Sequence, residues 1–205
     1  MFDAVVRPRI APPLDALATR LAARGVSANS LTAAGFVAGV GACASAAFAL
    51  WPAALALWLV NRALDGLDGA VARAGTATER GGFLDIVADF TIYAGFVLAV
   101  AIAEPDARLA CAALLVTYYV SGTAFLAWSS LAERRALVTG DERSLRFVGG
   151  LAEGTETVIA YVLFCLFPGQ AEPIAWGFAG VVAITAVQRI VAGQNRLRAG
   201  PEPPG

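Results

Sequence analysis

Residues 61–89 read NRALDGLDGAVARAGTATERGGFLDIVAD, and this stretch decides how the chain folds. Asp65 and Asp68 lie near the end of one apolar run, and Asp85 and Asp89 lie near the start of the next. On an α-helix, residues three or four positions apart share a face, so each pair projects from one side of its helix. Because the connection between the runs is short, the two helices are antiparallel neighbours. We therefore expect the four carboxylates to converge.

The rest of the chain is unusually apolar. Of its 205 residues, 58% are hydrophobic and only 15% are charged, and the mean hydropathy is +0.67. A soluble core of this size cannot hide that much apolar surface, so the excess must face lipid. With about 20 apolar residues for each span, we expect an all-α membrane protein with six transmembrane helices, at about residues 30–51, 52–73, 82–103, 109–131, 148–167 and 173–192.

A different kind of helix is expected before the first span. From Leu14 to Leu21, leucines recur at helical spacing with charged residues elsewhere around the helix, which predicts an amphipathic helix within residues 1–25 that lies on the membrane surface. We expect residues 1–198 to form a single membrane domain. Residues 199–205 are rich in Pro and Gly, which indicates a disordered tail.

The arginines indicate how the protein is oriented. Six spans place both termini and the loops 74–81 and 132–147 on one side. Every arginine except Arg108 lies on that side or within the span ends that border it, so the positive-inside rule makes this side cytoplasmic. The charges within the spans also lie toward it. Because a charge inside a membrane is costly, we expect a shared polar cavity that opens to the cytoplasm.

The residue types restrict the chemistry of this cavity. Four carboxylates in a poorly hydrated cleft repel one another unless cations intervene. The sequence has no His, and its three Cys lie far apart, so oxygen ligands for Mg²⁺, Mn²⁺ or Ca²⁺ are favoured over a zinc site. Four carboxylates suffice for two divalent cations, an arrangement suited to phosphoryl transfer. The formal net charge of −1 gives no indication of a nucleic-acid partner.

Small residues flank the carboxylates. Gly69 and Ala72 follow the first Asp pair, and Gly81 lies one turn before the second. Small side chains let a bulky ligand approach the backbone, and Arg73 is placed to pair with a phosphate. Alternatively, the small residues allow close helix packing, and Asp65 and Arg73 extend into interfacial water. Packing does not explain four facing aspartates, so we favour a functional site.

The complete pattern is Asp65-x2-Asp68-Gly69-x2-Ala72-Arg73-x7-Gly81-x3-Asp85-x3-Asp89. It resembles the signature of the CDP-alcohol phosphatidyltransferase family, with every fixed position filled. The resemblance implies transfer of a phosphatidyl group from a CDP-linked lipid, such as CDP-diacylglycerol, to an alcohol, with release of CMP, in phospholipid biosynthesis.

The resemblance also assigns roles to single residues. The four aspartates would bind two divalent cations, Mg²⁺ or Mn²⁺, and Asp89 would also serve as the general base. The CDP moiety would be held by Gly69, Ala72, Arg73 and Gly81.

Two further segments extend the resemblance. Family members carry Pro-Asn-x-Leu-Thr before the first span, and the corresponding residues 28–32 here lack the Pro. Asn29 and Thr32 either touch the diphosphate or serve as helix caps. Residues 150–157 resemble a bacterial inner-membrane subgroup, and the family resemblance implies a homodimer.

The acceptor pocket is the least defined part of the prediction. Arg146 and Arg189 lie nearest the expected cavity and are candidates for gripping a phosphorylated acceptor such as glycerol 3-phosphate or an inositol phosphate. Glu153 and Glu156 either pair with these arginines or bind a polar or cationic headgroup such as serine or ethanolamine. The expected acceptor is a small polar alcohol.

Two other classes of membrane protein use intramembrane aspartates. Prenyltransferases hold an isoprenoid diphosphate through Mg²⁺, but their Asp-rich motifs lie farther apart and they need more spans. A divalent-cation carrier would also need several carboxylates, but carriers usually contain internal repeats, and this sequence shows none. Only the phosphatidyltransferase interpretation predicts metal-dependent release of CMP.

Overall fold

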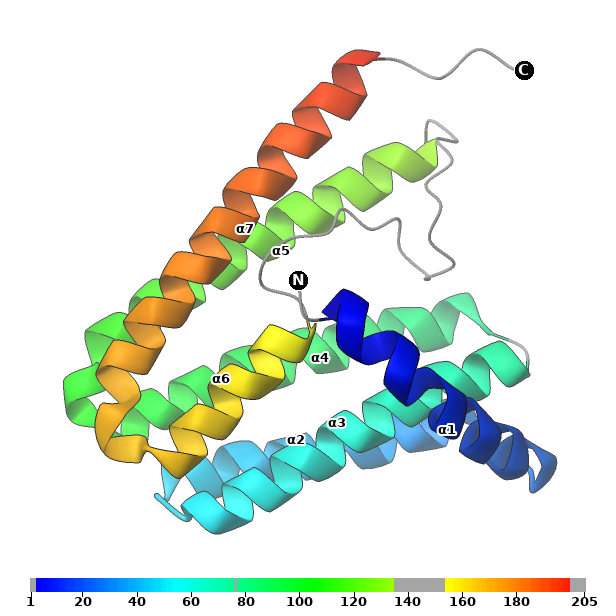
Figure 1. Ribbon diagram of the computed structural model, residues 1–205, viewed down its shortest axis with the longest axis horizontal. Coiled ribbons are helices and arrows are strands. Elements are labelled where there is room, and N and C mark those ends of the chain that lie inside the picture. The colour runs from blue at the N-terminus through cyan, green and yellow to red at the C-terminus, as the bar shows by residue number, and fades with distance from the viewer. Residues whose placement is uncertain (1–2, 76, 135–153, 200–205) are drawn as a thin grey trace.

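The computed structural model describes residues 3–75, 77–134 and 154–199, and within these ranges all regular secondary structure is helical, as predicted (Figure 1). The α-helices are α1 (Asp3–Ala23), α2 (Ala28–Ala47), α3 (Trp51–Ala74), α4 (Glu79–Ala103), α5 (Arg108–Arg134), α6 (Gly154–Leu166) and α7 (Ala171–Ala199). Short 3-10 helices, η1 (Pro105–Ala107) and η2 (Pro168–Gln170), precede α5 and α7.

Four of these helices are long and apolar enough to cross a membrane, namely α2, α4, α5 with η1, and α7 with η2. Helix α3 has 24 residues but contains two arginines and two aspartates. Helix α6 is described from Gly154 onward, and the earlier part of its predicted span, from residue 148, lies outside the described residues. The fold is therefore that of a helical membrane protein, and the count of six spans stays a prediction.

The helix ends differ from the ends of the predicted apolar spans. Helix α2 ends at Ala47, four residues before the predicted span does, and Ala49 has a positive φ of 56° in the turn that follows. The turn residues are themselves apolar, so hydropathy does not mark them. Conversely, α7 extends to Ala199, beyond the predicted end at residue 192, because polar helix-forming residues continue the helix after the apolar run stops.

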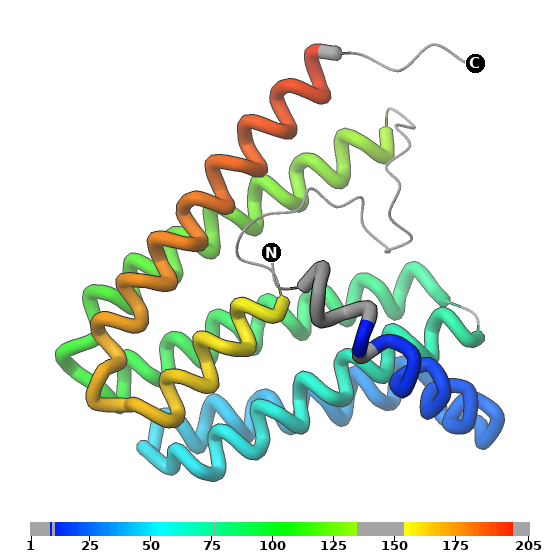
Figure 2. Tube along the Cα trace, in the orientation of Figure 1, coloured from blue at the N-terminus to red at the C-terminus, as the bar shows by residue number. Residues whose placement is uncertain are grey.

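The helices converge at one end of the molecule and diverge toward the other (Figure 1; Figure 2). The α2–α3, α4–α5 and α6–α7 connections lie at the convergent end. Helix α2 packs against α3 and α4, while α5 lies alongside α7. Helix α6 contacts both α3 and α7, so it joins the two groups. The helix ends nearest most of the arginines lie at the divergent end.

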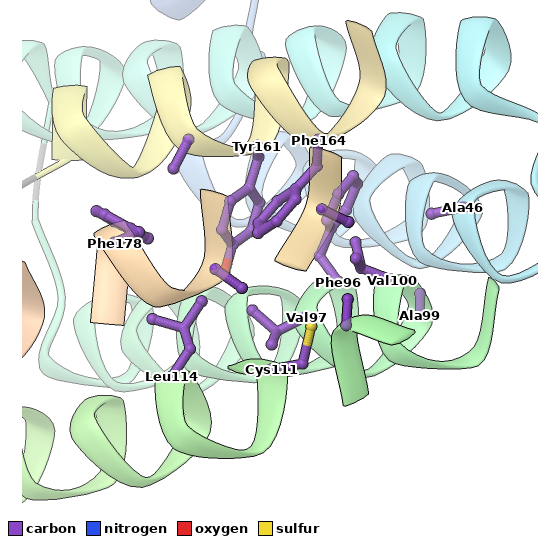
Figure 3. Close-up of a cluster of buried hydrophobic side chains, with 14 of the residues drawn as sticks. Ala46, Phe96, Val97, Ala99, Val100, Cys111, Leu114, Tyr161, Phe164 and Phe178 are labelled. Atoms are coloured by element: carbon purple, nitrogen blue, oxygen red, sulfur yellow. The ribbon is translucent and has the colours of Figure 1, made fainter. Parts of the chain in front are cut away.

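The convergent end contains the main apolar core (Figure 3). Its largest fully buried side chains include Trp58, Phe96, Tyr161 and Phe164. The Phe96 and Tyr161 rings stack with centroids 4.8 Å apart, and the Trp58 ring centroid is also 4.8 Å from that of Tyr161. Because lipid is as apolar as a side chain, close packing rather than removal from water stabilises such a core. This end is therefore the closely packed base of the fold.

Large apolar side chains also cover the outside of the helices. Val37, Leu109, Val116 and Val187 are each more than half exposed. A soluble protein rarely exposes apolar side chains over so much of its surface, but lipid contact is the natural environment for them. The exposed surface thus agrees with the hydropathy of the helices.

Helix α1 is present within the predicted range 1–25 and packs against α3. Its Ala18 is fully buried and forms a small apolar cluster with Ala70 and Val71. A half-exposed ion pair between Asp15 and Arg73, with a nitrogen–oxygen distance of 3.4 Å, lies at the same contact. The position of α1 at the membrane surface stays a prediction.

Candidate active site

Three of the predicted carboxylates come together between α3 and α4. Asp65, Asp68 and Asp85 each place one carboxylate oxygen within 4.8 Å of the others. Asp68 is only 5% exposed, and the other two are half-buried. The two helices therefore bring the predicted residues to facing surfaces.

The local sequence explains why the two helices start and stop where they do. Helix α3 ends at Ala74 with Gly75 as its C-cap, and α4 begins after Thr78. The Thr78 side-chain oxygen accepts a hydrogen bond from the Gly81 backbone N–H at 3.1 Å, which is a standard helix N-cap. A sharp start for α4 fixes the register of Asp85 against the aspartates of α3.

The carboxylates line a small cavity enclosed by α2, α3 and α4. Its lining residues are Thr32, Gly35, Phe36, Asn61, Asp65, Asp68, Asp85, Ala88 and Asp89. Thr32 belongs to α2, and its hydroxyl donates a hydrogen bond of 2.6 Å to Asp68 Oδ2. The first span therefore contributes directly to the site, at one of the residues predicted to contact the diphosphate.

Asp89 lines the same cavity but has a different partner. Its Oδ1 accepts a hydrogen bond of 2.8 Å from Arg62 Nη2, and the Tyr93 hydroxyl lies 3.4 Å from its Oδ2. Arg62 also lies 3.4 Å from Asp65. Among the described residues, Arg62 therefore partly offsets the charge of the four carboxylates through its contacts with Asp89 and Asp65.

The geometry of the three convergent carboxylates fits a divalent cation. Oxygen ligands of Mg²⁺ or Ca²⁺ lie about 2.0–2.6 Å from the ion, so two of them are at most about 4–5 Å apart. The oxygens of Asp65, Asp68 and Asp85 meet this limit. The donors are all hard oxygens, which favours Mg²⁺, Mn²⁺ or Ca²⁺ over softer metals.

The predicted small residues lie at the rim of this region. A Cβ atom on Gly81 would be 2.9 Å from Asn29 Oδ1, and one on Gly69 would be 3.4 Å from Arg73 Nη1. Gly81 therefore brings the start of α4 against the start of α2, and Asn29 is exposed there. Ala72 is half-buried on α3.

Arg73 has a partner that the sequence did not indicate. It is exposed, and its Nη2 atom lies 3.4 Å from Asp15 Oδ1 on α1. The pairing depends on how α1 docks on α3, which no local spacing reveals. Because the pair is half exposed, the guanidinium remains accessible to another anion.

The predicted acceptor residues are only partly described. Arg189 on α7 donates hydrogen bonds to Ser121 of α5, at 2.9 Å to the side-chain oxygen and 3.3 Å to the backbone oxygen. Its guanidinium also lies 5.3 Å from the centroid of the Phe125 ring. Glu156 is half-buried in the first turn of α6. Arg146 and Glu153 lie outside the described residues.

Sequence reasoning missed the polar residues beneath the carboxylates. Asn61 is buried, donating to the Gly35 carbonyl at 2.8 Å and accepting from Arg62 Nε at 2.8 Å. Their spacing could have indicated them, because Arg62 lies three residues before Asp65 and Tyr93 lies four residues after Asp89. A charged residue within an apolar span needs a partner, and these positions share a face with the aspartates.

The chain matches known proteins over nearly all of its length. The family model for CDP-alcohol phosphatidyltransferases matches residues 26–191. The chain is 39% identical over 204 residues to Inner membrane protein YnjF of Escherichia coli, covering 97% of this chain and 98% of that protein. It is 30% identical over 201 residues to archaetidylinositol phosphate synthase of Pyrococcus horikoshii, covering 95% of this chain and 98% of that protein.

A solved structure has the same fold. It is the crystal structure of Mycobacterium tuberculosis phosphatidylinositol phosphate synthase (PgsA1) with CDP-DAG bound, which aligns with a TM-score of 0.68 at 22% identity. The alignment covers 88% of this chain and 92% of that one. From the family match and the 39% identical relative, the chain belongs to the CDP-alcohol phosphatidyltransferase family, the membrane enzymes that transfer a substituted phosphate group from a CDP-linked donor to an alcohol.

Proposed function

We propose that the cavity between α2, α3 and α4 is the active site of this transferase, with CDP-diacylglycerol as its donor. The observation that carries the proposal is the convergence of Asp65, Asp68 and Asp85, with oxygens within 4.8 Å of one another, in a cavity that Asp89 also lines. The donor class agrees with the family and with the lipid named for the mycobacterial structure. Neither a prenyltransferase nor a cation carrier accounts for the family match.

In this proposal, Asp65, Asp68, Asp85 and Asp89 hold two divalent cations, Mg²⁺ or Mn²⁺. Such cations, when bound, neutralise the diphosphate and stabilise the charge on its leaving group. Three of the aspartates already lie at ligand separations. Asp89 lines the same cavity, and among the described residues its Oδ2 has the Tyr93 hydroxyl, 3.4 Å away, as its hydrogen-bond partner. Thr32 keeps Asp68 in place through its hydrogen bond.

The CDP moiety is proposed to bind at the rim, over residues that leave the backbone open. Gly69 and Gly81 present no side chains there, and Ala72 presents only a methyl group. Arg73 is exposed and can exchange Asp15 for a phosphate oxygen. Asn29 is exposed at the first turn of α2, where helix N–H groups favour an anion.

Asp89 is proposed as the general base. The acceptor hydroxyl oxygen bonds to the lipid-side phosphorus, the bond from that phosphorus to the bridging oxygen breaks, and CMP leaves with the bridging oxygen. The hydroxyl proton passes to Asp89. Because the sequence has no His, a carboxylate is the available base of suitable reach.

The acceptor is proposed to be a small polar alcohol, with a phosphorylated polyol as the first choice. The name of the archaeal relative, an inositol phosphate lipid synthase, supports this choice. Arg189, held by Ser121 on α5, and Arg146 are the proposed phosphate ligands, and Glu153 and Glu156 are their proposed ion-pair partners.

The proposed setting is the bacterial inner membrane, with both termini and the active site cytoplasmic, in a homodimer. The bias of the arginines toward one side supports the orientation. The name of the Escherichia coli relative, an inner membrane protein, supports the location.

The test uses purified protein in lipid nanodiscs with CDP-diacylglycerol and a panel of alcohols, namely inositol phosphate, glycerol 3-phosphate and serine. We expect release of CMP that requires both Mn²⁺ or Mg²⁺ and one alcohol, and that chelation with EDTA abolishes. The lipid product, identified by mass spectrometry, then names the acceptor. Folded protein that releases no CMP with any alcohol, with either metal present, would contradict the proposal.

A further inference from the structure

Arg62 is a largely buried cation that contacts two of the cavity's carboxylates. Its side chain is only 11% exposed, and its guanidinium carbon lies 4.8 Å from the ring centroid of Trp58 and 4.9 Å from that of Tyr93. Trp58 is itself part of the apolar core. Two aromatic rings therefore fix the position of the charge.

Hydrogen bonds fix the orientation of the same guanidinium. Nη2 donates to Asp89 Oδ1 at 2.8 Å, and Nη1 donates to the Tyr93 hydroxyl at 2.6 Å. Nε donates to Asn61 Oδ1 at 2.8 Å, while the Asn61 amide is anchored on the Gly35 carbonyl. The planar fork of an arginine can meet these three acceptors at once, which an ammonium on a flexible chain cannot do.

This arrangement treats the two oxygens of Asp89 differently. Oδ1 is bound by Arg62 at 2.8 Å, whereas the partner of Oδ2 among the described residues is the Tyr93 hydroxyl at 3.4 Å. A half-buried carboxylate beside three others would be unfavourable without such a partner. The arginine thus both compensates the charge of Asp89 and holds Oδ1, which leaves Oδ2 as the less strongly bound oxygen of this cavity-lining side chain.

We propose that Arg62 is a positioning residue of the transferase, which anchors Asp89 through Oδ1 and so presents Oδ2 to the acceptor hydroxyl. The proposal rests on the proposed function of Asp89 as the base. In this proposal Arg62 acts through Asp89 and not by contact with the donor or the acceptor. Arg62 also lowers the affinity of the site for divalent cations, because its positive charge beside Asp89 and Asp65 weakens the attraction of the carboxylates for them.

The test compares Arg62→Gln with the matched control Arg108→Gln at the opposite end of the fold. For Arg62→Gln we expect kcat to fall at least about tenfold, because misplacing a reacting group by about 1 Å has effects of this order or more, with KM for CDP-diacylglycerol within about twofold of wild type. We expect Mn²⁺ binding, titrated without donor, to tighten about threefold or more because a positive charge is lost. Arg108→Gln should change neither.

A fall in kcat together with a rise in Mn²⁺ affinity distinguishes loss of positioning from loss of structure, because a disordered site would lose both turnover and metal affinity. Arg62→Lys separates charge from geometry: Mn²⁺ affinity should return close to wild type, while kcat stays at least about threefold low because the fork is lost. This variant also serves if Arg62→Gln does not fold. Wild-type kcat in either variant would overturn the inference.

The two proposals fail in different ways. Wild-type protein that releases no CMP would overturn the proposed function. The Mn²⁺ titration needs no turnover, so it still decides on Arg62: unchanged or weaker Mn²⁺ affinity in a folded Arg62→Gln variant would overturn the charge effect proposed for this residue.

Discussion

The two ends of the helical fold differ in what holds them together. At the convergent end, uncharged aromatic side chains such as Trp58, Phe96 and Phe164 pack against one another. In the cavity between α2, α3 and α4, four carboxylates lie close together, and hydrogen bonds from Thr32 and Arg62 hold three of them. Arg62 lies at the boundary, with aromatic rings on one side and Asp89 on the other.

The comparison shows that one end of the helices provides the packing and the other end provides the site. Packing at the apolar end keeps α3 and α4 in fixed register, and this register lets like charges face one another. A change at the polar end should therefore alter turnover with little effect on stability, and a change at the apolar end should do the reverse. Four substitutions test this separation.

The largest effect is expected at the proposed base. Asp89→Asn keeps the shape of the side chain but cannot accept the hydroxyl proton, so kcat for CMP release should fall about a thousandfold. The melting temperature should change little, because the amide oxygen can still accept the hydrogen bond from Arg62 and the removal of one of four like charges offsets the lost counter-charge. Turnover within about tenfold of wild type would refute the role of Asp89 and, with it, the division into two regions.

The next effect is expected in the apolar core. Phe164 is fully buried, and Phe164→Ala should lower the free energy of unfolding by about 3 kcal/mol through the cavity it leaves. KM for CDP-diacylglycerol of the folded fraction should stay unchanged. Leu166→Ala, on the same helix but 53% exposed, is the control and should melt near the wild-type temperature in nanodiscs. Equal melting temperatures for the two variants would contradict the claim that packing at the convergent end stabilises the fold.

A smaller effect on donor binding is expected at the rim. A Cβ on Gly81 would approach Asn29 Oδ1 to 2.9 Å and Thr78 Oγ1 to 3.0 Å, so Gly81→Ala must displace one of them. We expect KM for CDP-diacylglycerol to rise about tenfold, or about 1.4 kcal/mol. Gly177→Ala is the control, since its Cβ would meet nothing within 4 Å. If the two variants share one KM, the rim is not part of the donor site.

The smallest effect is expected where α1 meets α3. Asp15 and Arg73 form a half-exposed pair at 3.4 Å, and such pairs contribute at most about 1 kcal/mol. Asp15→Asn should leave stability almost unchanged. It should lower KM for CDP-diacylglycerol slightly, because Arg73 is freed for the phosphate. A clear rise in KM would show that Asp15 supports the donor site instead of competing with it.

Local spacing in the sequence was enough to predict the convergence of the carboxylates. The i,i+3 and i,i+4 spacings and a short connection constrain Asp65, Asp68 and Asp85 to facing surfaces, and the structure has them there. Thr32 was also predicted at the site, but its hydrogen bond to Asp68 was not predicted. The prediction for the aspartates needed only helical periodicity and a short connection, whereas the prediction for Thr32 came from the family resemblance.

Contacts between distant helices could not be predicted in the same way. The Arg62–Asp89 pair depends on the register of α3 against α4, and the Arg73–Asp15 pair depends on the docking of α1. The ends of α2 and α7 were missed because hydropathy reports contact with lipid and not the extent of a helix.

The central claim is that aspartates of α3 and α4 hold the divalent cations that turnover needs, and Asp68→Asn tests it most directly. Mn²⁺ titration and CMP release would be measured on the same preparation, with Asp106→Asn in η1 as the matched control. The account predicts that Asp68→Asn weakens Mn²⁺ binding at least about tenfold, as loss of a metal-site partner does, and abolishes CMP release, while Asp106→Asn matches wild type. A folded Asp68→Asn variant with wild-type Mn²⁺ affinity and turnover would contradict it.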